Sequence, residues 1–240
     1  MEPSELKSGV RELIFDNARG SLLLSFIYVL IMTIAYYLMF RLPGVSEAYV
    51  RYMALIQTGE IHSLVRFIGY ISPIGIFFAL LLLLFGSVIR AGYKCCCLNT
   101  SRNRGGSIGD LLSGFRLMKK VIVISLITSV LVILWSSLFF FPGLAAFYRY
   151  RLAYYILLDD PDKSAMQCII ESKFLTKGNK LDLFILDLSF IGWFVFSAAV
   201  ILTTYYYISL PLTVVSLWLC PYIGITRSLF YDHLLTKATA

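Results

Sequence analysis

Apolar side chains run along this chain in long blocks, separated by short polar and basic segments. An α-helix needs about 20 apolar residues to cross ~30 Å of hydrocarbon. Six blocks reach or approach that length, so the pattern predicts six transmembrane helices in a single integral membrane domain over 1–240. The expected spans are about 21–40, 71–90, 121–141, 143–158, 181–205 and 207–227. The predicted fold class is an all-α membrane protein.

The spans group into three hairpin-like repeats. In each repeat a short amphipathic segment precedes a first span, a turn follows, and the second span ends in Arg-x-x-aromatic. These endings are Arg90-Ala-Gly-Tyr93, Arg151-Leu-Ala-Tyr154 and Arg227-Ser-Leu-Phe230. We therefore expect a short amphipathic cytoplasmic helix before each hairpin.

The three amphipathic segments cover 4–19, 107–120 and 163–180, and their apolar residues recur at helical spacing. Ser107 and Asp110 resemble a capping box, Asp160 before Pro161 resembles an N-cap followed by a first helical proline, and Gly178 suits a helix end. The apolar positions are Leu6, Val10, Leu13, Ile108, Leu111, Leu112, Phe115, Met166, Ile169, Ile170 and Phe174.

Basic amphipathic helices beside a span are typical of the membrane interface, where Lys and Arg lie near anionic headgroups. The expected partners are thus the lipid bilayer and its anionic headgroups. The alternative is that these helices pack together as a cytoplasmic cap that recruits a membrane-protein partner. The pattern alone does not separate the two interpretations.

Basic residues also predict the orientation of the chain. Eighteen Lys and Arg residues lie on the side of the termini and three on the other side. Cytoplasmic loops retain positive charge, so both termini are expected in the cytoplasm. The net charge of +7 is explained by topology, and we expect no nucleic-acid partner. The content of 59% hydrophobic residues and the mean hydropathy of +0.80 agree with a multi-pass protein.

Asp187 is the acidic residue that fits least well within the predicted spans. It lies about 10 Å inside the fifth span, where a lone charge is costly and needs a partner. The turn at Pro142-Gly143 places Arg151 about 12 Å and Arg149 about 15 Å inside the fourth span, at a similar depth. We expect Asp187 to pair with Arg151 or Arg149. A fixed ion pair that sets helix register and a proton or anion relay are both compatible with this pattern, whereas Asp182 is expected to face water.

Motifs for catalysis and cofactor binding are absent from the sequence. No HExxH, GxSxG, Walker A or GxGxxG pattern occurs. We therefore expect no enzyme activity, no catalytic residues and no cofactor. The adjacent Cys95, Cys96 and Cys97 have no zinc-ligand spacing, so no metal site is expected and reduced thiols are the simpler interpretation.

A resemblance to a known family rests on residues from about 153 to 234. It is carried by Asp160-Pro161, Ser172-Lys173, Lys177-Gly178-Asn179-Lys180, Phe184, Leu188-Ser189-Phe190-Ile191-Gly192-Trp193, Cys220-Pro221-Tyr222 and Phe230-Tyr231. The stretch resembles a family of bacterial six-span integral membrane proteins known only as a domain of unknown function. The resemblance implies a bacterial plasma membrane and six spans, and it supplies no catalytic or binding residues.

Two functions are compatible with these features. The first is a non-enzymatic multi-pass protein that acts at the cytoplasmic leaflet in envelope organisation, or as the membrane subunit of a larger assembly. The second is a small transporter or exporter of an amphiphilic substrate that uses the intramembrane Asp187/Arg151 site.

Overall fold

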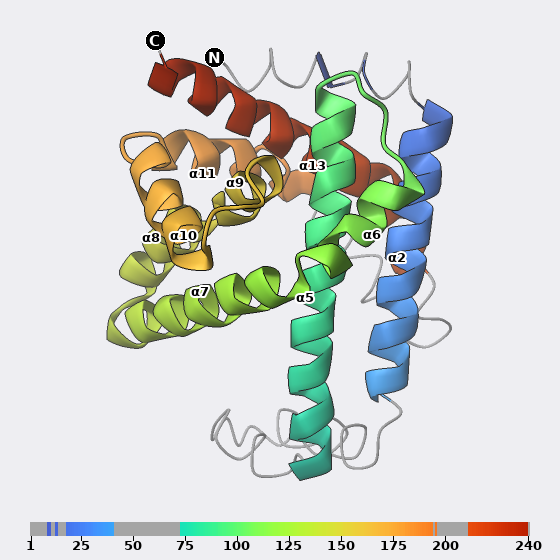
Figure 1. Ribbon diagram of the computed structural model, residues 1–240. Helices are drawn as coiled ribbons and strands as arrows, with labels where there is room; N and C mark the ends of the chain where they lie inside the picture. The colour runs from blue at the N-terminus through green and yellow to red at the C-terminus, as the bar shows by residue number, and fades with distance from the viewer. Residues whose placement is uncertain are drawn as a thin grey trace. The chain divides into compact units, whose positions relative to one another are not determined.

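The computed structural model describes residues 9–10, 13, 18–40, 73–193, 195 and 211–239 (Figure 1). Every element in these residues is a helix, which confirms the all-α class. The chain divides into two compact units, Leu30–Gly86 and the larger unit Met1–Val29 with Ser87–Ala240. The larger unit contains all the residues discussed below as parts of a site. Most of the first amphipathic segment, 4–19, lies outside the described residues.

Two of the described helices are long and apolar enough to cross a membrane. The candidate spans are Leu80–Ser101, within α5 (Pro73–Ser101), and Met118–Leu138, which is α7. A shorter apolar stretch, Gly20–Ala35, lies in α2 (Ala18–Phe40). Only 17% of the α7 span is buried. The core helix of a soluble protein would be mostly buried, so the apolar surface of α7 favours a lipid environment.

α7 and α8 (Phe140–Tyr150) form a hairpin around Phe139, which has an extended backbone (Figure 1). The turn therefore precedes the expected turn at Pro142-Gly143. Pro142 lies in the first turn of α8, where a helix does not need its N–H group. A Cβ atom at Gly143 would lie 2.1 Å from Ser136 Oγ, so glycine permits the close approach of the two helices.

The fourth and fifth expected spans are not continuous helices, which corrects the prediction from the sequence. The segment 143–158 is divided between α8 and α9 (Ala153–Asp159), with a break at Arg151 and Leu152. The fifth begins with α11 (Lys180–Leu188) and turns at Ser189 and Phe190. Eleven-residue α8 is about 16 Å long, too short to span a bilayer by itself. Hydropathy does not report such breaks, because the residues on both sides of each break are apolar.

The second and third expected segments are helical, as α6 (Ile108–Arg116) and α10 (Ala165–Leu175), but only α6 is clearly amphipathic, because apolar side chains of α10 lie on both its buried and its exposed sides. The capping box of Ser107 and Asp110 is confirmed at the start of α6. The expected start of α10 at Asp160-Pro161 is wrong, because Ser164 caps this helix together with Gln167 and Asp160 ends α9. Gly178 has a φ of +86° just beyond the end of α10.

α13 (Pro211–Thr239) is longer than the sixth expected span and runs through Pro221 without a break. Its C-terminal half contributes Tyr231 and Leu234 to a buried core that also includes Leu157, Ile169 and Leu186. A second core joins the N-terminal half of α2 to the C-terminal half of α5, where the Tyr28 and Tyr93 rings stack 4.2 Å apart. The larger unit therefore has a packed helical frame that holds the polar side chains described next.

Candidate functional site

Asp187, in the last turn of α11, is bound by three side chains. Arg151 forms an ion pair with its Oδ2 atom and also lies 3.4 Å from Oδ1 through Nη2. Arg227 Nη2 donates to Oδ1 at 3.0 Å, and the Tyr148 hydroxyl donates to Oδ2 at 3.0 Å. Both carboxylate oxygens are thus occupied. The side chain of Asp187 is 17% exposed, so this ion cluster is largely enclosed by protein.

Arg151 reaches Asp187 from the link between α8 and α9. It ends α8 with helical dihedral angles, and α9 starts after Leu152. Its guanidinium carbon lies 5.4 Å from the centre of the Phe147 ring and 5.5 Å from that of Tyr148. Aromatic faces attract cations, so the two rings stabilise the position of the Arg151 guanidinium in addition to the carboxylate of Asp187. The Arg151 side chain is 11% exposed, the least of the three charged groups.

Arg227, from α13, is the main participant that the sequence analysis missed. It was expected to end the sixth span, yet it donates to Asp187 through both Nε and Nη2. The signal was present in the repeats, because Arg151 and Arg227 occupy the same place in Arg-x-x-aromatic. Tyr148 could have been found in a similar way, since it lies three residues before Arg151, on the same side of a helix.

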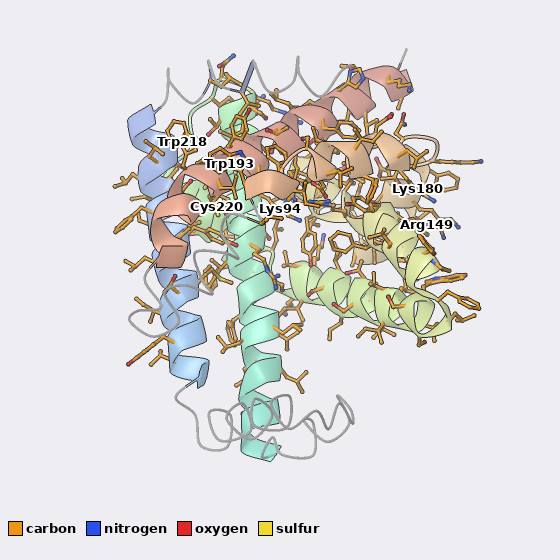
Figure 2. All side chains as sticks on the ribbon, turned by 180° about the vertical axis from the view of Figure 1, so that it is seen from behind. Lys94, Arg149, Lys180, Trp193, Trp218 and Cys220 are labelled. Atoms are coloured by element: carbon orange, nitrogen blue, oxygen red, sulfur yellow. The ribbon has the colours of Figure 1, made fainter. Side chains whose placement is uncertain are left out.

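Arg149, the other expected partner, does not contact Asp187 in the part of the chain that the structure describes. Its backbone carbonyl accepts hydrogen bonds from the hydroxyls of Ser172 (2.8 Å) and Thr176 (3.3 Å) on and after α10. Figure 2 shows its side chain near Lys180 and apart from Lys94. Burial and the neighbouring charge of Arg149 lower the pKa of Lys180. Asp182 is exposed in the first turn of α11, as expected.

Lys94, on α5, adds a further positive charge near this ion cluster. Its ammonium lies 4.1 Å from the centre of the Tyr154 ring and 5.3 Å from that of Tyr155. The charges of Arg151 and Arg227 act on it electrostatically, and so does that of Arg90. Among the described residues, Lys94 contacts no carboxylate. In the sequence, Lys94 is a signal of topology only.

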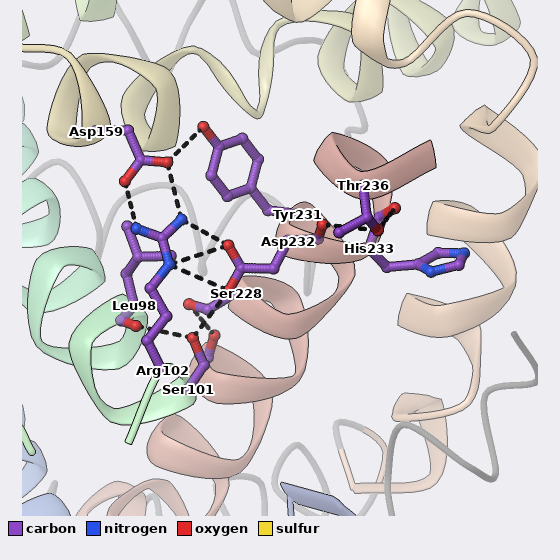
Figure 3. Close-up of polar contacts among 10 residues, drawn as sticks. Leu98, Ser101, Arg102, Asp159, Ser228, Tyr231, Asp232, His233 and Thr236 are labelled. Atoms are coloured by element: carbon purple, nitrogen blue, oxygen red, sulfur yellow. Dashed lines mark hydrogen bonds and ion pairs between the residues drawn. The ribbon is translucent and has the colours of Figure 1, made fainter. Parts of the chain in front are cut away.

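A second polar cluster holds the end of α5 to α9 and α13 (Figure 3). Arg102 binds both oxygens of Asp159, at 2.6 and 2.9 Å, and Asp232 at 2.6 Å. The Tyr231 hydroxyl donates to Asp159 Oδ2 at 2.9 Å. The two carboxylates raise the pKa of Arg102, and burial together with the Asp159 charge raises the pKa of Tyr231 well above its usual value. Three helices are therefore joined through one guanidinium.

Tyr231 gives this second cluster a predicted pH dependence. Because the folded state favours the neutral phenol, its contribution to stability is complete below pH about 10 and is lost as the pH rises further. Tyr231→Phe is expected to lower the free energy of unfolding by about 1 kcal/mol at pH 7. The variant should lose less stability than the wild type above pH 10, as measured by thermal unfolding at a series of pH values. Parallel curves for the two proteins would contradict this prediction.

The cysteines of α5 are packing residues in the structure. Cys96 and Cys97 are buried, and all five cysteines of the chain are free. Cys96 Sγ lies 3.6 Å from the carbonyl oxygen of Ser107, and a Cβ atom at Gly224 would lie 2.5 Å from Cys97 Sγ. Gly224 therefore lets α13 approach α5 closely at Cys97.

The fold and the site define an all-helical protein with two candidate membrane-spanning helices and a polar cluster centred on Asp187. Residues 141–238 match the model of a family described as "Protein of unknown function (DUF975)". This match confirms the resemblance to a domain of unknown function, and it contains Asp187, Arg151 and Arg227 but not Lys94. No curated protein and no solved structure matches the chain.

Proposed function

We propose that this protein is a non-enzymatic multi-pass protein of the bacterial plasma membrane that acts at the cytoplasmic leaflet through α6 and α10. In this proposal the chain crosses the membrane six times in three repeats, the fourth and fifth crossings are made of broken helices, and both termini are in the cytoplasm. It serves envelope organisation or is the membrane subunit of a larger assembly. The apolar α7 surface and the distribution of Lys and Arg support the membrane placement.

Two exposed apolar stripes carry the proposal. On α6, Leu111 is buried, while three apolar side chains at helical spacing are exposed. On α10, Ile169 is buried in the core, and a similar stripe faces outward. The exposed residues are Ile108, Leu112 and Phe115 on α6, and Met166, Ile170 and Phe174 on α10. Both helices thus have one face packed on the protein and a second apolar face that nothing in the described chain covers.

The bilayer interface is the surface that best fits these stripes. α6 ends at Arg116 and α7 begins at Met118, so the stripe of α6 is one residue away from a candidate span. Arg116 and Lys173 lie in the last turns of α6 and α10, where cations are favourable and can reach anionic headgroups. An interfacial helix buries its apolar face about 5–10 Å into the boundary of headgroups and acyl chains.

Tryptophan quenching in nanodiscs tests the placement of α10. In a background with Trp135, Trp193 and Trp218 replaced by Phe, a tryptophan is introduced by Ile170→Trp or by Asp162→Trp. Asp162 is exposed in the loop before α10, so it is the control. We expect lipids brominated on the acyl chains near the headgroup to quench the tryptophan at 170 strongly and the one at 162 weakly. Equal, weak quenching at both positions would contradict an interfacial α10 and favour a protein-facing stripe.

A further inference from the structure

Positive charge exceeds negative charge around Asp187. Lys94, Arg151 and Arg227 come from α5, the α8–α9 link and α13, and the two guanidinium groups act electrostatically on the ammonium. Asp187 is the carboxylate that binds both arginines. In their protonated forms these three side chains against the one carboxylate of Asp187 leave an excess of two positive charges. The aromatic rings beside Lys94 attract it but do not neutralise it.

Several hydrogen-bond donors of these cations are unused. In the described part of the chain, Lys94 Nζ, Arg151 Nε and Arg227 Nη1 have no acceptor, whereas both oxygens of Asp187 are occupied. Ser21 Oγ is the one side-chain polar atom among the described residues that is fully sealed from solvent and lacks a partner. Lys94 Nζ, Arg151 Nε and Arg227 Nη1 also lack a partner in the described chain but are not fully sealed, so solvent or a ligand can reach them.

We infer that Lys94, Arg151 and Arg227 form a binding site for a phosphate group. A phosphate oxygen accepts several hydrogen bonds, and guanidinium and ammonium groups together are its usual protein ligands. Asp187 holds both arginines in place, and the bound anion neutralises the remaining excess of positive charge. The group is either the phosphodiester of an anionic lipid or a free phosphate. The choice of a lipid rests on the membrane placement proposed above, but the site itself does not.

A ligand site and a structural cluster differ in what Lys94 does for stability. Without a ligand, Lys94 is repelled by the arginines, so removal of its charge should stabilise the protein. With the anion bound, Lys94 supplies a charge-assisted contact, so the same substitution should weaken binding about tenfold or more. A lysine that is repelled by the arginines but binds no anion would show the gain in stability without any loss of ligand response.

The experiment compares the wild type, Lys94→Met and Lys119→Met in detergent. Lys119 is exposed near the start of α7 and makes no hydrogen bond or ion pair in the described chain, so its substitution removes the same charge away from the site. Thermal unfolding is measured with no addition, with inorganic phosphate, with phosphatidylglycerol and with phosphatidylcholine. Native mass spectrometry measures retained lipid in parallel. Lys94→Gln replaces Lys94→Met if the methionine variant does not fold.

We expect phosphatidylglycerol, phosphate or both to raise the unfolding temperature of the wild type and of Lys119→Met, and phosphatidylcholine to have little effect. Lys94→Met should unfold at a higher temperature without additions and should lose most of the response. A response to phosphate as well as lipid identifies the phosphate group as sufficient, and a response to phosphatidylglycerol alone identifies the lipid. The inference is overturned if the wild type responds to neither anion, or if Lys94→Met responds as strongly as Lys119→Met. The phosphate measurement involves no bilayer, so its failure is distinct from a failure of the interfacial placement.

Discussion

Asp187→Asn is expected to lower the free energy of unfolding by about 3–5 kcal/mol, because breaking a buried ion pair leaves its partner charged and unpaired. Here the loss affects two guanidinium groups, those of Arg151 and Arg227, which would then repel each other without a carboxylate between them. Asparagine keeps the size of the side chain, so the change is mainly one of charge. Unfolding by increasing sodium dodecyl sulfate in mixed micelles, followed by tryptophan fluorescence, measures the effect.

The arginine variants give the matching comparison. Arg151→Gln leaves Asp187 with Arg227 and Tyr148, so a loss of only about 1.5–3 kcal/mol is expected for one charged hydrogen-bond partner. The double variant Asp187→Asn/Arg151→Gln should lose less than the sum of the two single losses. Asp182→Asn on the exposed side of α11 should change stability by less than about 0.5 kcal/mol. Equal losses for Asp187→Asn and Arg151→Gln would show that Asp187 does not hold both arginines.

The ion pair of Asp187 could be predicted from the sequence, because a charged side chain within an apolar span requires a partner of opposite charge. A carboxylate within an apolar block needs a partner, and counting residues from a turn gives the depth of each candidate. Arg151 and Arg149 are both at a suitable depth, so the sequence predicts either of them as the partner. The structure places Arg151 beside Asp187, whereas the backbone of Arg149 binds Ser172 and Thr176. Two residues of separation place side chains on different sides of a helix, and depth does not report that difference.

The start of α6 could be predicted from a short sequence motif. The capping box of Ser107 and Asp110 lies entirely within four residues, and it starts α6 as expected. For α10 the sequence predicted a start at Asp160-Pro161, which is wrong. Ser164 and Gln167 exchange two hydrogen bonds at the start of α10, while Asp160 ends the preceding helix.

The contacts of Arg227 and Lys94 could not be predicted from the sequence. The charge count treats each basic residue as a sign of the side of the membrane, and it contains no information on which residues meet in three dimensions. Contacts of Asp187 with α13 and of Lys94 with the tyrosines of α9 join segments that are 40 or more residues apart. The break at Arg151 was also invisible to hydropathy.

α5 and α6 approach each other through two glycines, Gly92 and Gly114. A Cβ atom at Gly92 would lie 1.9 Å from the carbonyl oxygen of Leu111, and one at Gly114 would lie 2.2 Å from the carbonyl oxygen of Val88. Both obstacles are backbone atoms, which no rotamer change can move. The close approach fixes the apolar stripe of α6 relative to the helix that carries Lys94, so it holds together two parts of the proposed function.

Gly92→Ala is therefore expected to lower the free energy of unfolding by about 3 kcal/mol, at the upper end of the usual cost of overpacking. Gly114→Ala should act in the same direction. Local helix propensity predicts the opposite sign, since alanine in a helix is favoured over glycine by about 1 kcal/mol. Gly20→Ala in α2 is the matched control, because a Cβ atom there meets nothing within 4 Å and should stabilise the protein slightly. Unfolding in mixed micelles gives the three values, and stabilisation by Gly92→Ala would show that α5 and α6 are not in backbone contact.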